Sequence, residues 1–224
     1  MKRTAWVVGA SGQVGSECVA LLCQDARYSS VLGIVRTATS LRHQRYREAV
    51  IDFDDLQRSG DWGKCDDIYF ALGQSSRDKA LFLKVDCQYP VLLARHAQLH
   101  GASRIGYVSS LGANLNSSND YFQVKAQAET ELCRLDFETV FFIRPSMIYG
   151  SKDNRRPFQR LSRHASRFLG WAFIGALKKY RPVSATCVAA ALINAVNGQV
   201  RGNHPIESNE IPQKEPHPAL FQPL

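Results

Sequence analysis

The sequence predicts an α/β protein in which a doubly wound parallel sheet is joined to a small C-terminal cap. Short apolar runs rich in valine, isoleucine and aromatic residues alternate with segments of helical periodicity. Glycines directly follow the first apolar run, and polar residues follow several of the others. This alternation indicates parallel strands covered by helices on both faces, with ligands bound at the carboxyl ends of the strands.

The expected elements follow one another along the first 150 residues. Strands are expected over residues 5–8, 31–35, 49–51, 67–72, 105–108 and 140–143, and helices over 14–23, about 76–100 and 121–135. Pro90 should kink or divide the second helix, because proline cannot donate a backbone hydrogen bond. Gly101 is expected to end that helix, and Asp120 to cap the start of the third.

The C-terminal part of the sequence is less regular. Helices are expected over residues 158–169 and 185–196, and the proline-rich chain from Gly202 is expected to be extended or loosely ordered. Residues 151–181 hold nine basic side chains and one acidic side chain, a balance equal to the net charge of the whole sequence, +8. We interpret this basic segment as a cap with solvated arginines.

Three alternatives for the basic segment remain: a site for an acidic ligand or cofactor phosphate, a homodimer or protein interface, and a nucleic-acid or membrane surface. No nucleic-acid motif accompanies the charge, so no nucleic-acid partner is expected. The small-molecule substrate is expected to contact this region.

Composition narrows the class of protein further. The 224 residues are 45% hydrophobic, which allows a substantial core, but no run reaches the roughly 18 apolar residues of a membrane span. The first residues lack the pattern of a signal peptide, so we expect a cytoplasmic protein. The six cysteines form no Cys-x-x-Cys pair and no zinc-like spacing, so reduced, mostly buried thiols and no metal site are expected.

The glycine-rich stretch predicts an anion site. Gly9, Gly12 and Gly15 are spaced Gly-x-x-Gly-x-x-Gly, directly after an expected strand and at the start of an expected helix. Glycines allow a sharp turn and a close approach of the backbone, while the helix N-terminus offers unpaired N–H groups and a partial positive charge. This loop is expected to cradle the pyrophosphate of a dinucleotide.

The end of the second expected strand predicts which dinucleotide binds. Proteins that bind NAD usually place an acidic residue there for the ribose hydroxyls, whereas an arginine accommodates the 2′-phosphate of NADP. Here the strand leads into Arg36 and Thr37 with no acid, so NADP(H) is expected in preference to NAD(H). Residues after the third and fourth strands are expected to border the adenosine half: Asp52, Phe53, Leu72 and Gly73.

A second motif predicts proton transfer. Tyr121 and Lys125 lie four residues apart, so a helix presents them on one face. An ammonium close to a phenol favours the phenolate, which helps the tyrosine to exchange a proton at neutral pH. Ser109 and Ser110 follow the fifth expected strand, and a serine hydroxyl at this place would orient a carbonyl oxygen, with Ser110 preferred.

Together these motifs resemble the short-chain dehydrogenase/reductase superfamily over roughly residues 4–150. Residues 144–150, Arg-Pro-Ser-Met-Ile-Tyr-Gly, are similar to a segment that lines the nicotinamide side in extended and atypical members. The stretches Val-Ser-Ser-Leu-Gly-Ala at 108–113 and Tyr-Phe-Gln-Val-Lys at 121–125 resemble the atypical branch that contains Tat-interacting-protein-type oxidoreductases and their bacterial relatives.

The resemblance implies a Rossmann-type fold, with an NADP-binding domain over residues 1–150 and a small substrate or cap region over 151–224, integral to a single domain. It places Pro145 beside the nicotinamide half of the cofactor. It also implies cofactor contacts at Ser11, Gly12, Gln13, Val14, Arg36, Leu72, Gly73, Tyr121, Lys125, Ile148 and Arg156.

The leading functional prediction is NADPH-dependent reduction of a carbonyl or quinone-like small molecule by hydride transfer. Ser110 would orient the oxygen, Tyr121 would be the general acid, and Lys125 would hold the ribose and support Tyr121. One alternative is a regulatory protein that senses NADP(H) with little or no turnover. Another is an NAD(P)-dependent epimerase or dehydratase, although enzymes of that kind acting on nucleotide sugars generally have a larger substrate domain.

Overall fold

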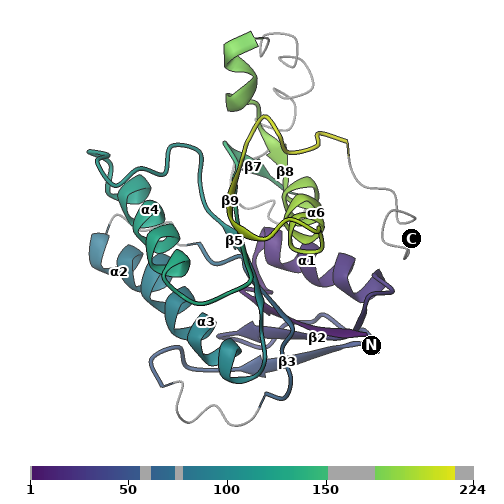
Figure 1. Ribbon diagram of the computed structural model, residues 1–224. Helices are drawn as coiled ribbons and strands as arrows, with labels where there is room; N and C mark the ends of the chain where they lie inside the picture. Colours follow the sequence, from purple (N-terminus) through teal and green to yellow (C-terminus); the bar gives the residue numbers. More distant parts are fainter. Residues whose placement is uncertain (1, 56–61, 74–77, 151–174, 215–224) are drawn as a thin grey trace.

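The computed structural model describes residues 2–55, 62–73, 78–150 and 175–214 (Figure 1). Seven parallel strands form the main sheet, in the order β3-β2-β1-β4-β5-β6-β9. The strand order reverses direction between β1 and β4, which is where the chain crosses from one half of the sheet to the other. The predicted doubly wound Rossmann-type sheet is therefore confirmed, and its ligand crevice is expected at the carboxyl ends of β1 and β4.

All six predicted strands are present, and five of them begin one to three residues earlier than expected. The strands of the main sheet are β1 Arg3–Val8, β2 Tyr28–Val35, β3 Tyr46–Val50, β4 Asp67–Phe70, β5 Arg104–Val108, β6 Thr139–Arg144 and β9 Gly202–Glu207. A separate pair of short parallel strands joins β7, Ile148–Tyr149, to β8, Val183–Ser184. This pair holds the segment after β6 against the segment that leads into the last helix.

The strand β9 corrects one expectation. The chain from Gly202 is extended, as predicted, but its first residues are ordered as an edge strand parallel to β6, from Thr139 opposite Gly202 to Arg144 opposite Glu207. Glycine, asparagine and proline all weaken a strand signal in the sequence. An edge strand nevertheless accommodates Pro205, because one side of such a strand needs no ladder partner.

The helices are α1 Gln13–Gln24, α2 Lys79–Leu83, α3 Tyr89–Leu99, α4 Asp120–Cys133 and α6 Ala185–Val196. The helix predicted over about 76–100 is divided, as expected: a π-helical turn, Lys84–Gln88, separates α2 from α3, and Pro90 lies in the first turn of α3. Asp120 is not the cap of α4. Asn119 takes that place, its side chain accepting a hydrogen bond from the Tyr121 N–H, and Asp120 becomes the first helical residue.

Helices cover both faces of the sheet and create two cores. Figure 1 shows α1 and α6 on one side, and α2, α3 and α4 on the other. Alternate residues of β1 supply both cores, because Val7 packs with α1 and α6 while Trp6 and Val8 pack with α3 and α4. All six cysteines are free, and only Cys133 is not fully buried.

The part of the chain after residue 150 is described only in pieces. The predicted helix over 158–169, Arg156 and most of the basic segment lie outside the described residues. Helix α6 packs against α1 and the sheet, and β9 extends the sheet, so both contribute to the same layers as residues 1–150. A separate cap region over 151–224 therefore remains a prediction.

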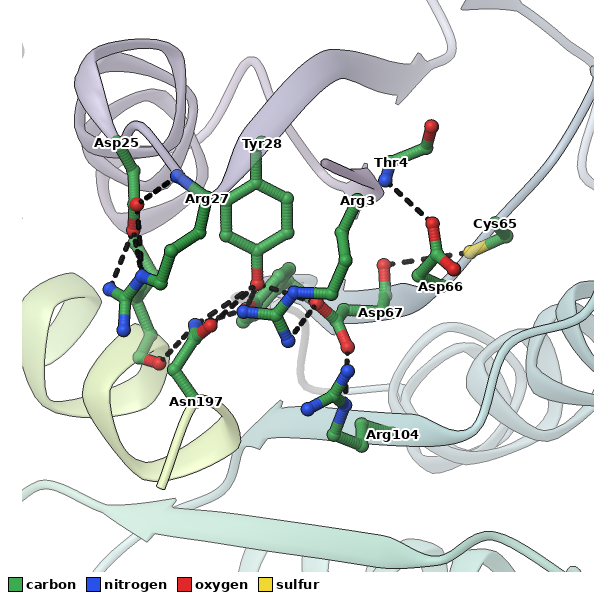
Figure 2. Close-up of polar contacts among 12 residues, drawn as sticks. Arg3, Thr4, Asp25, Arg27, Tyr28, Cys65, Asp66, Asp67, Arg104 and Asn197 are labelled. Atoms are coloured by element: carbon green, nitrogen blue, oxygen red, sulfur yellow. Dashed lines mark hydrogen bonds and ion pairs between the residues drawn. The ribbon is translucent and has the colours of Figure 1, made fainter. Parts of the chain in front are cut away.

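A buried polar cluster holds the amino ends of the strands together (Figure 2). Asp67, the fully buried first residue of β4, forms ion pairs with Arg3 at 3.0 Å and with Arg104 at 2.7 Å. The hydroxyl of Tyr28 donates to the same carboxylate at 2.5 Å, and Asn197 at the end of α6 donates to that hydroxyl at 3.0 Å. The cluster joins β1, β2, β4, β5 and α6 at the edge opposite to the glycine loop.

Candidate active site

The predicted anion loop connects β1 to α1, and close packing explains two of its glycines. Gly9 has a φ of +81°, and a Cβ there would lie 2.8 Å from the carbonyl oxygen of Ala71 after β4. A Cβ on Gly15 would lie 2.0 Å from the carbonyl oxygen of Gly9. Any side chain at either position would push the loop away from β4 or the helix away from the loop.

The N-terminus of α1 is open at the carboxyl edge of the sheet. The helix begins at Gln13, its N-cap Gly12 offers no side-chain acceptor, and its first turn carries no acidic residue. Ser11 and Gly12 are exposed, whereas Val14 and Gly15 are buried against the sheet. The orphan N–H groups and the positive end of the helix dipole are thus available to an anion, which fits a pyrophosphate.

The residues predicted to border the adenosine half follow β2, β3 and β4, which lie in the same half of the sheet as β1 or directly beside it. Arg36 and Thr37 are exposed directly after β2, and Arg36 forms no ion pair within the described part of the chain. Asp52, after β3, is exposed and accepts a hydrogen bond from the backbone of Asp54. The half-buried Leu72 and the exposed Gly73 follow β4. The fold therefore brings the ends of these three parallel strands to the edge where β1 also ends, as expected.

Helix α4 carries both members of the predicted Tyr-Lys pair. The helix follows β5, so it starts near the carboxyl edge of the sheet, where Tyr121 is half-buried. The ring of Tyr121 packs edge-on against Phe82 of α2, with centroids 5.6 Å apart. Lys125 lies one turn deeper and is only 2% exposed.

The ammonium of Lys125 is surrounded by acceptors. Its Nζ lies 2.9 Å from Oδ1 of Asp86, 3.2 Å from the hydroxyl of Tyr107 and 3.0 Å from the carbonyl oxygen of Val108. Burial alone would lower the pKa of Lys125, but the neighbouring Tyr107, Asp86 and Tyr121 oxygens outweigh it and raise the pKa above its ordinary value. Lys125 is therefore a buried, charged lysine.

The two candidate serines differ in their surroundings. Tyr107 packs in the core under α3 and α4, and Val108 packs in the opposite core. The N–H of Ser109 continues the ladder by donating to Ile143 O at 2.8 Å, so Ser109 shares the face of Tyr107 and α4. Its hydroxyl is buried and has no hydrogen-bond partner among the described residues, whereas the Ser110 hydroxyl donates to Leu111 O at 3.3 Å.

The segment that begins at Arg144 connects the end of β5 to the glycine loop. The Pro145 carbonyl accepts from Leu111 N at 2.9 Å, which ties the end of β6 to the end of β5. Ile148, half-buried, opens the short strand β7. A Cβ on Gly150 would lie 3.6 Å from the side chain of Gln13, so this segment reaches the start of α1.

Arg144 itself does not serve as a ligand group. Its guanidinium binds Glu129 of α4 at 2.5 Å and Glu207 of β9 at 2.9 Å, and these hydrogen bonds raise its pKa further despite partial burial. Sequence reasoning also missed Asp86 and Tyr107. Asp86 interrupts an apolar helical stretch, which is the one signal that could have marked it.

Comparison with known proteins gives relatives of similar length. No family model matches the chain. It is 27% identical to HTATIP2 of Rattus norvegicus over 201 residues, which cover 87% of this chain and 82% of that protein. It is 28% identical to the mitochondrial FMP52 protein of Candida glabrata over 167 residues, 70% of this chain and 69% of that protein. The chain spans about half of the Aspergillus terreus fmp52-1 protein, at 30% identity.

Solved structures share the fold. The enzyme WbmG of Bordetella bronchiseptica in complex with NAD superposes with a TM-score of 0.68 at 15% identity, covering 94% of this chain and 74% of that one. A short-chain dehydrogenase/reductase superfamily protein from Agrobacterium tumefaciens with bound NAD gives 0.68 at 15% identity, covering 91% and 77%. The chain is thus similar in sequence to HTATIP2 and FMP52 proteins and shares its fold with NAD-binding short-chain dehydrogenase/reductase structures. The resemblance noted in the sequence is thereby confirmed.

The described residues of the protein include no membrane-spanning helix, since none of their helices is both long and apolar enough. Its fungal FMP52 relatives are named as mitochondrial proteins. The cytoplasmic location expected from the sequence therefore stays a prediction.

Proposed function

We propose that this protein binds NADPH and reduces a carbonyl or quinone-like small molecule by hydride transfer. The observation that carries the proposal is the convergence of two motifs on one edge of the sheet. The glycine loop and the open N-terminus of α1 follow β1, while Tyr121 and Lys125 begin the helix that follows β5. The solved structures named above, which share this fold, hold NAD.

The preference for NADPH rests on the end of β2. Arg36 is exposed and unpaired within the described residues, and the strand end offers no carboxylate to a ribose 2′-hydroxyl. A guanidinium at this place supplies two N–H donors to a phosphate. Fluorescence titration with NADPH and with NADH measures the preference directly, and equal affinity for both cofactors would contradict it.

Each residue around the proposed nicotinamide site has a separate role in hydride and proton transfer. Bound NADPH supplies the hydride to the carbonyl carbon. Tyr121 donates its phenolic proton to the carbonyl oxygen, which completes the alcohol, and the charge of Lys125 one turn away stabilises the phenolate left behind. A serine hydroxyl orients the oxygen. Ser109 joins Ser110 as a candidate for this role, because its hydroxyl is on the α4 face and lacks a partner among the described residues.

Replacement of Tyr121 by phenylalanine tests the reaction. NADPH consumption would be followed against aldehydes, ketones and quinones, and Tyr121→Phe is expected to lower turnover by about 100-fold or more while NADPH affinity stays nearly constant. Tyr46→Phe is the matched control, since that hydroxyl contacts Glu48 on the edge strand β3. Undiminished turnover in Tyr121→Phe would eliminate the mechanism, and separate alanine variants of Ser109 and Ser110 identify the orienting hydroxyl.

A redox-sensing protein that binds NADP(H) with little turnover is the second candidate. The observation that favours it is the full engagement of the Lys125 ammonium by protein acceptors, which leaves it without a free donor for ribose in this conformation. Tight NADPH binding without consumption across the substrate panel would support it. An epimerase or dehydratase would instead retain tightly bound cofactor through purification. We propose the cytoplasm as the compartment, which fractionation of cells would test.

A further inference from the structure

The buried carboxylate of Asp86 contacts the proposed active-site lysine from another helix. Asp86 has no exposed surface, and its Oδ1 lies 2.9 Å from Nζ of Lys125. The other two acceptors of the ammonium, the Tyr107 hydroxyl and the Val108 carbonyl, both belong to β5. An ammonium has three N–H donors, and three acceptors surround this one. Asp86 is the acceptor among them that carries a full negative charge.

An irregular turn places Asp86 at this position. Asp86 lies in the π-helical turn Lys84–Gln88, and π-turns inside helices are often found at functional sites. Pro90, four residues later, has no N–H to donate to the Asp86 carbonyl. The Tyr107 hydroxyl donates to that carbonyl instead, at 2.6 Å. One tyrosine therefore joins the backbone of the turn to the ammonium of Lys125.

We propose that Asp86 is a positioning residue that anchors the Lys125 ammonium, in its charged form, one turn below Tyr121. The inference rests on the proposed function for the role of Lys125. The contact between Asp86 and Lys125 does not depend on that function. Three titratable groups surround the ammonium: Asp86 from the π-turn, Tyr107 from β5 and Tyr121 from α4 itself. Of these, the aspartate is the carboxylate, and it forms the ion pair that can balance a buried positive charge.

A purely structural ion pair is the competing explanation. Such a pair could be replaced by well-packed apolar residues without loss of stability. Its removal could shift the Lys125 titration, but it would leave the affinity for cofactor unchanged at every pH at which the protein stays folded. The positioning role predicts that both change. Loss of the Asp86 charge should leave a folded protein in which Lys125 releases its proton at a lower pH, because a buried lysine without a counter-ion favours the neutral amine.

The experiment measures the titration of Lys125 in the intact, ligand-free chain. The Cε resonances of 13C-lysine-labelled protein would be followed with pH, and Lys125→Met would identify the signal. Lys125 of the wild type is expected to stay charged beyond the ordinary lysine pKa of about 10.4, whereas in Asp86→Asn it is expected to titrate at least about one pH unit below that value. Identical titration in both proteins would overturn the proposal.

NADPH binding provides the second readout. Between about pH 7 and pH 10, affinity is expected to stay nearly constant in the wild type and to fall about tenfold in Asp86→Asn as Lys125 loses its charge. Circular dichroism would verify that each protein remains folded at every pH. A shifted lysine titration with unchanged NADPH affinity would show a structural pair and overturn the positioning role. Failure of the wild type to bind NADPH or NADH would overturn the proposed function, while the lysine titration would still decide whether Asp86 anchors the charge.

Tyr107→Phe keeps the test decisive if Asp86→Asn does not fold. This variant removes one of the groups that raise the pKa of Lys125 but leaves the carboxylate, so Lys125 is expected to stay charged beyond the ordinary lysine pKa of about 10.4. Titration about one pH unit or more below that value in Tyr107→Phe would show that the hydroxyl, rather than Asp86, holds the charge, and would overturn the proposal.

Discussion

At the amino ends of the strands, Asp67 forms ion pairs with Arg3 and Arg104 and accepts a hydrogen bond from the Tyr28 hydroxyl, so opposite charges meet within the protein (Figure 2). The carboxyl ends are arranged differently. There the N-terminus of α1 has no side-chain cap, and the buried Ser109 hydroxyl has no partner among the described residues. Buried polar groups normally find partners, so the open groups at the carboxyl edge support the proposed cofactor site there.

The contrast separates stability from binding along the same strands. Each strand begins in one region and ends in the other, because all seven run parallel. Substitutions at the amino ends should therefore change the free energy of unfolding without changing cofactor affinity. Substitutions at the carboxyl ends should chiefly change affinity. The following variants test that division, in order of decreasing effect.

Asp67→Ala should be the most damaging change to stability. It removes the shared partner of two arginines and a tyrosine, and loss of one member of a buried charged cluster costs about 3 kcal/mol. Urea unfolding measures this loss. Arg104→Met, which leaves Arg3 and Tyr28 on the carboxylate, should cost less. NADPH affinity of the folded fraction should be unchanged, and a large loss of affinity would break the proposed separation of the two edges.

Gly15→Ala tests the packing of the loop. Alanine would ordinarily favour a helix over glycine by about 1 kcal/mol, but here its Cβ would meet the Gly9 carbonyl at 2.0 Å. NADPH affinity is expected to fall by about tenfold or more, an amount equivalent to about 1.4 kcal/mol, together with some stability. Gly198→Ala is the comparison, since it follows α6 away from the loop and a Cβ there would come no closer than 3.2 Å, to the Ala195 carbonyl oxygen. Normal affinity in Gly15→Ala would show that the loop does not hold the cofactor.

Arg36→Ala should affect one cofactor alone. Loss of charged hydrogen bonds worth about 1.5–3 kcal/mol would weaken NADPH binding by about tenfold to a hundredfold and leave NADH binding unchanged. Fluorescence titration measures both affinities, and the unfolding midpoint should not move because Arg36 is exposed. Arg42→Ala, in the same loop, is the matched control, since that guanidinium donates to local carbonyls. Equal losses for NADPH and NADH would contradict the assignment of the 2′-phosphate.

His96→Phe should have the smallest effect, and only in acid. His96 packs against Trp62 and His100, with centroids 4.7 Å away from each, and burial followed by the charge of His100 lowers its pKa. The unfolded chain takes up this proton near pH 6.5, so the folded protein loses stability as the pH falls below about 6.5 towards the lowered pKa.

The melting temperature, compared at neutral and mildly acid pH, measures this effect. The acid-induced decrease should be smaller in His96→Phe than in the wild type. The exposed His43, replaced by glutamine, should leave the decrease as it is. If His43→Gln reduced the decrease as much as His96→Phe, burial of His96 would not be its cause.

Much of the fold could be predicted because its signals are local. Valine- and isoleucine-rich runs predicted six strands, and Pro90 predicted the division of the long helix that the structure shows. The strand β9 was not identified as such, because Gly202 and Pro205 give it the local character of a loop. It is a strand because β6 offers it an open edge, which is a property of the assembled sheet.

The candidate site divides in the same way. The sequence by itself determined the glycine loop and the four-residue spacing of Tyr121 and Lys125, since both depend on neighbouring residues and helix geometry. Only the tertiary structure decided that Asp86 is the counter-ion of Lys125 and that Arg144 binds Glu129 and Glu207. These partners come from elements far apart in the chain. No periodicity specifies them, because each depends on how the helices and strands pack after they have formed.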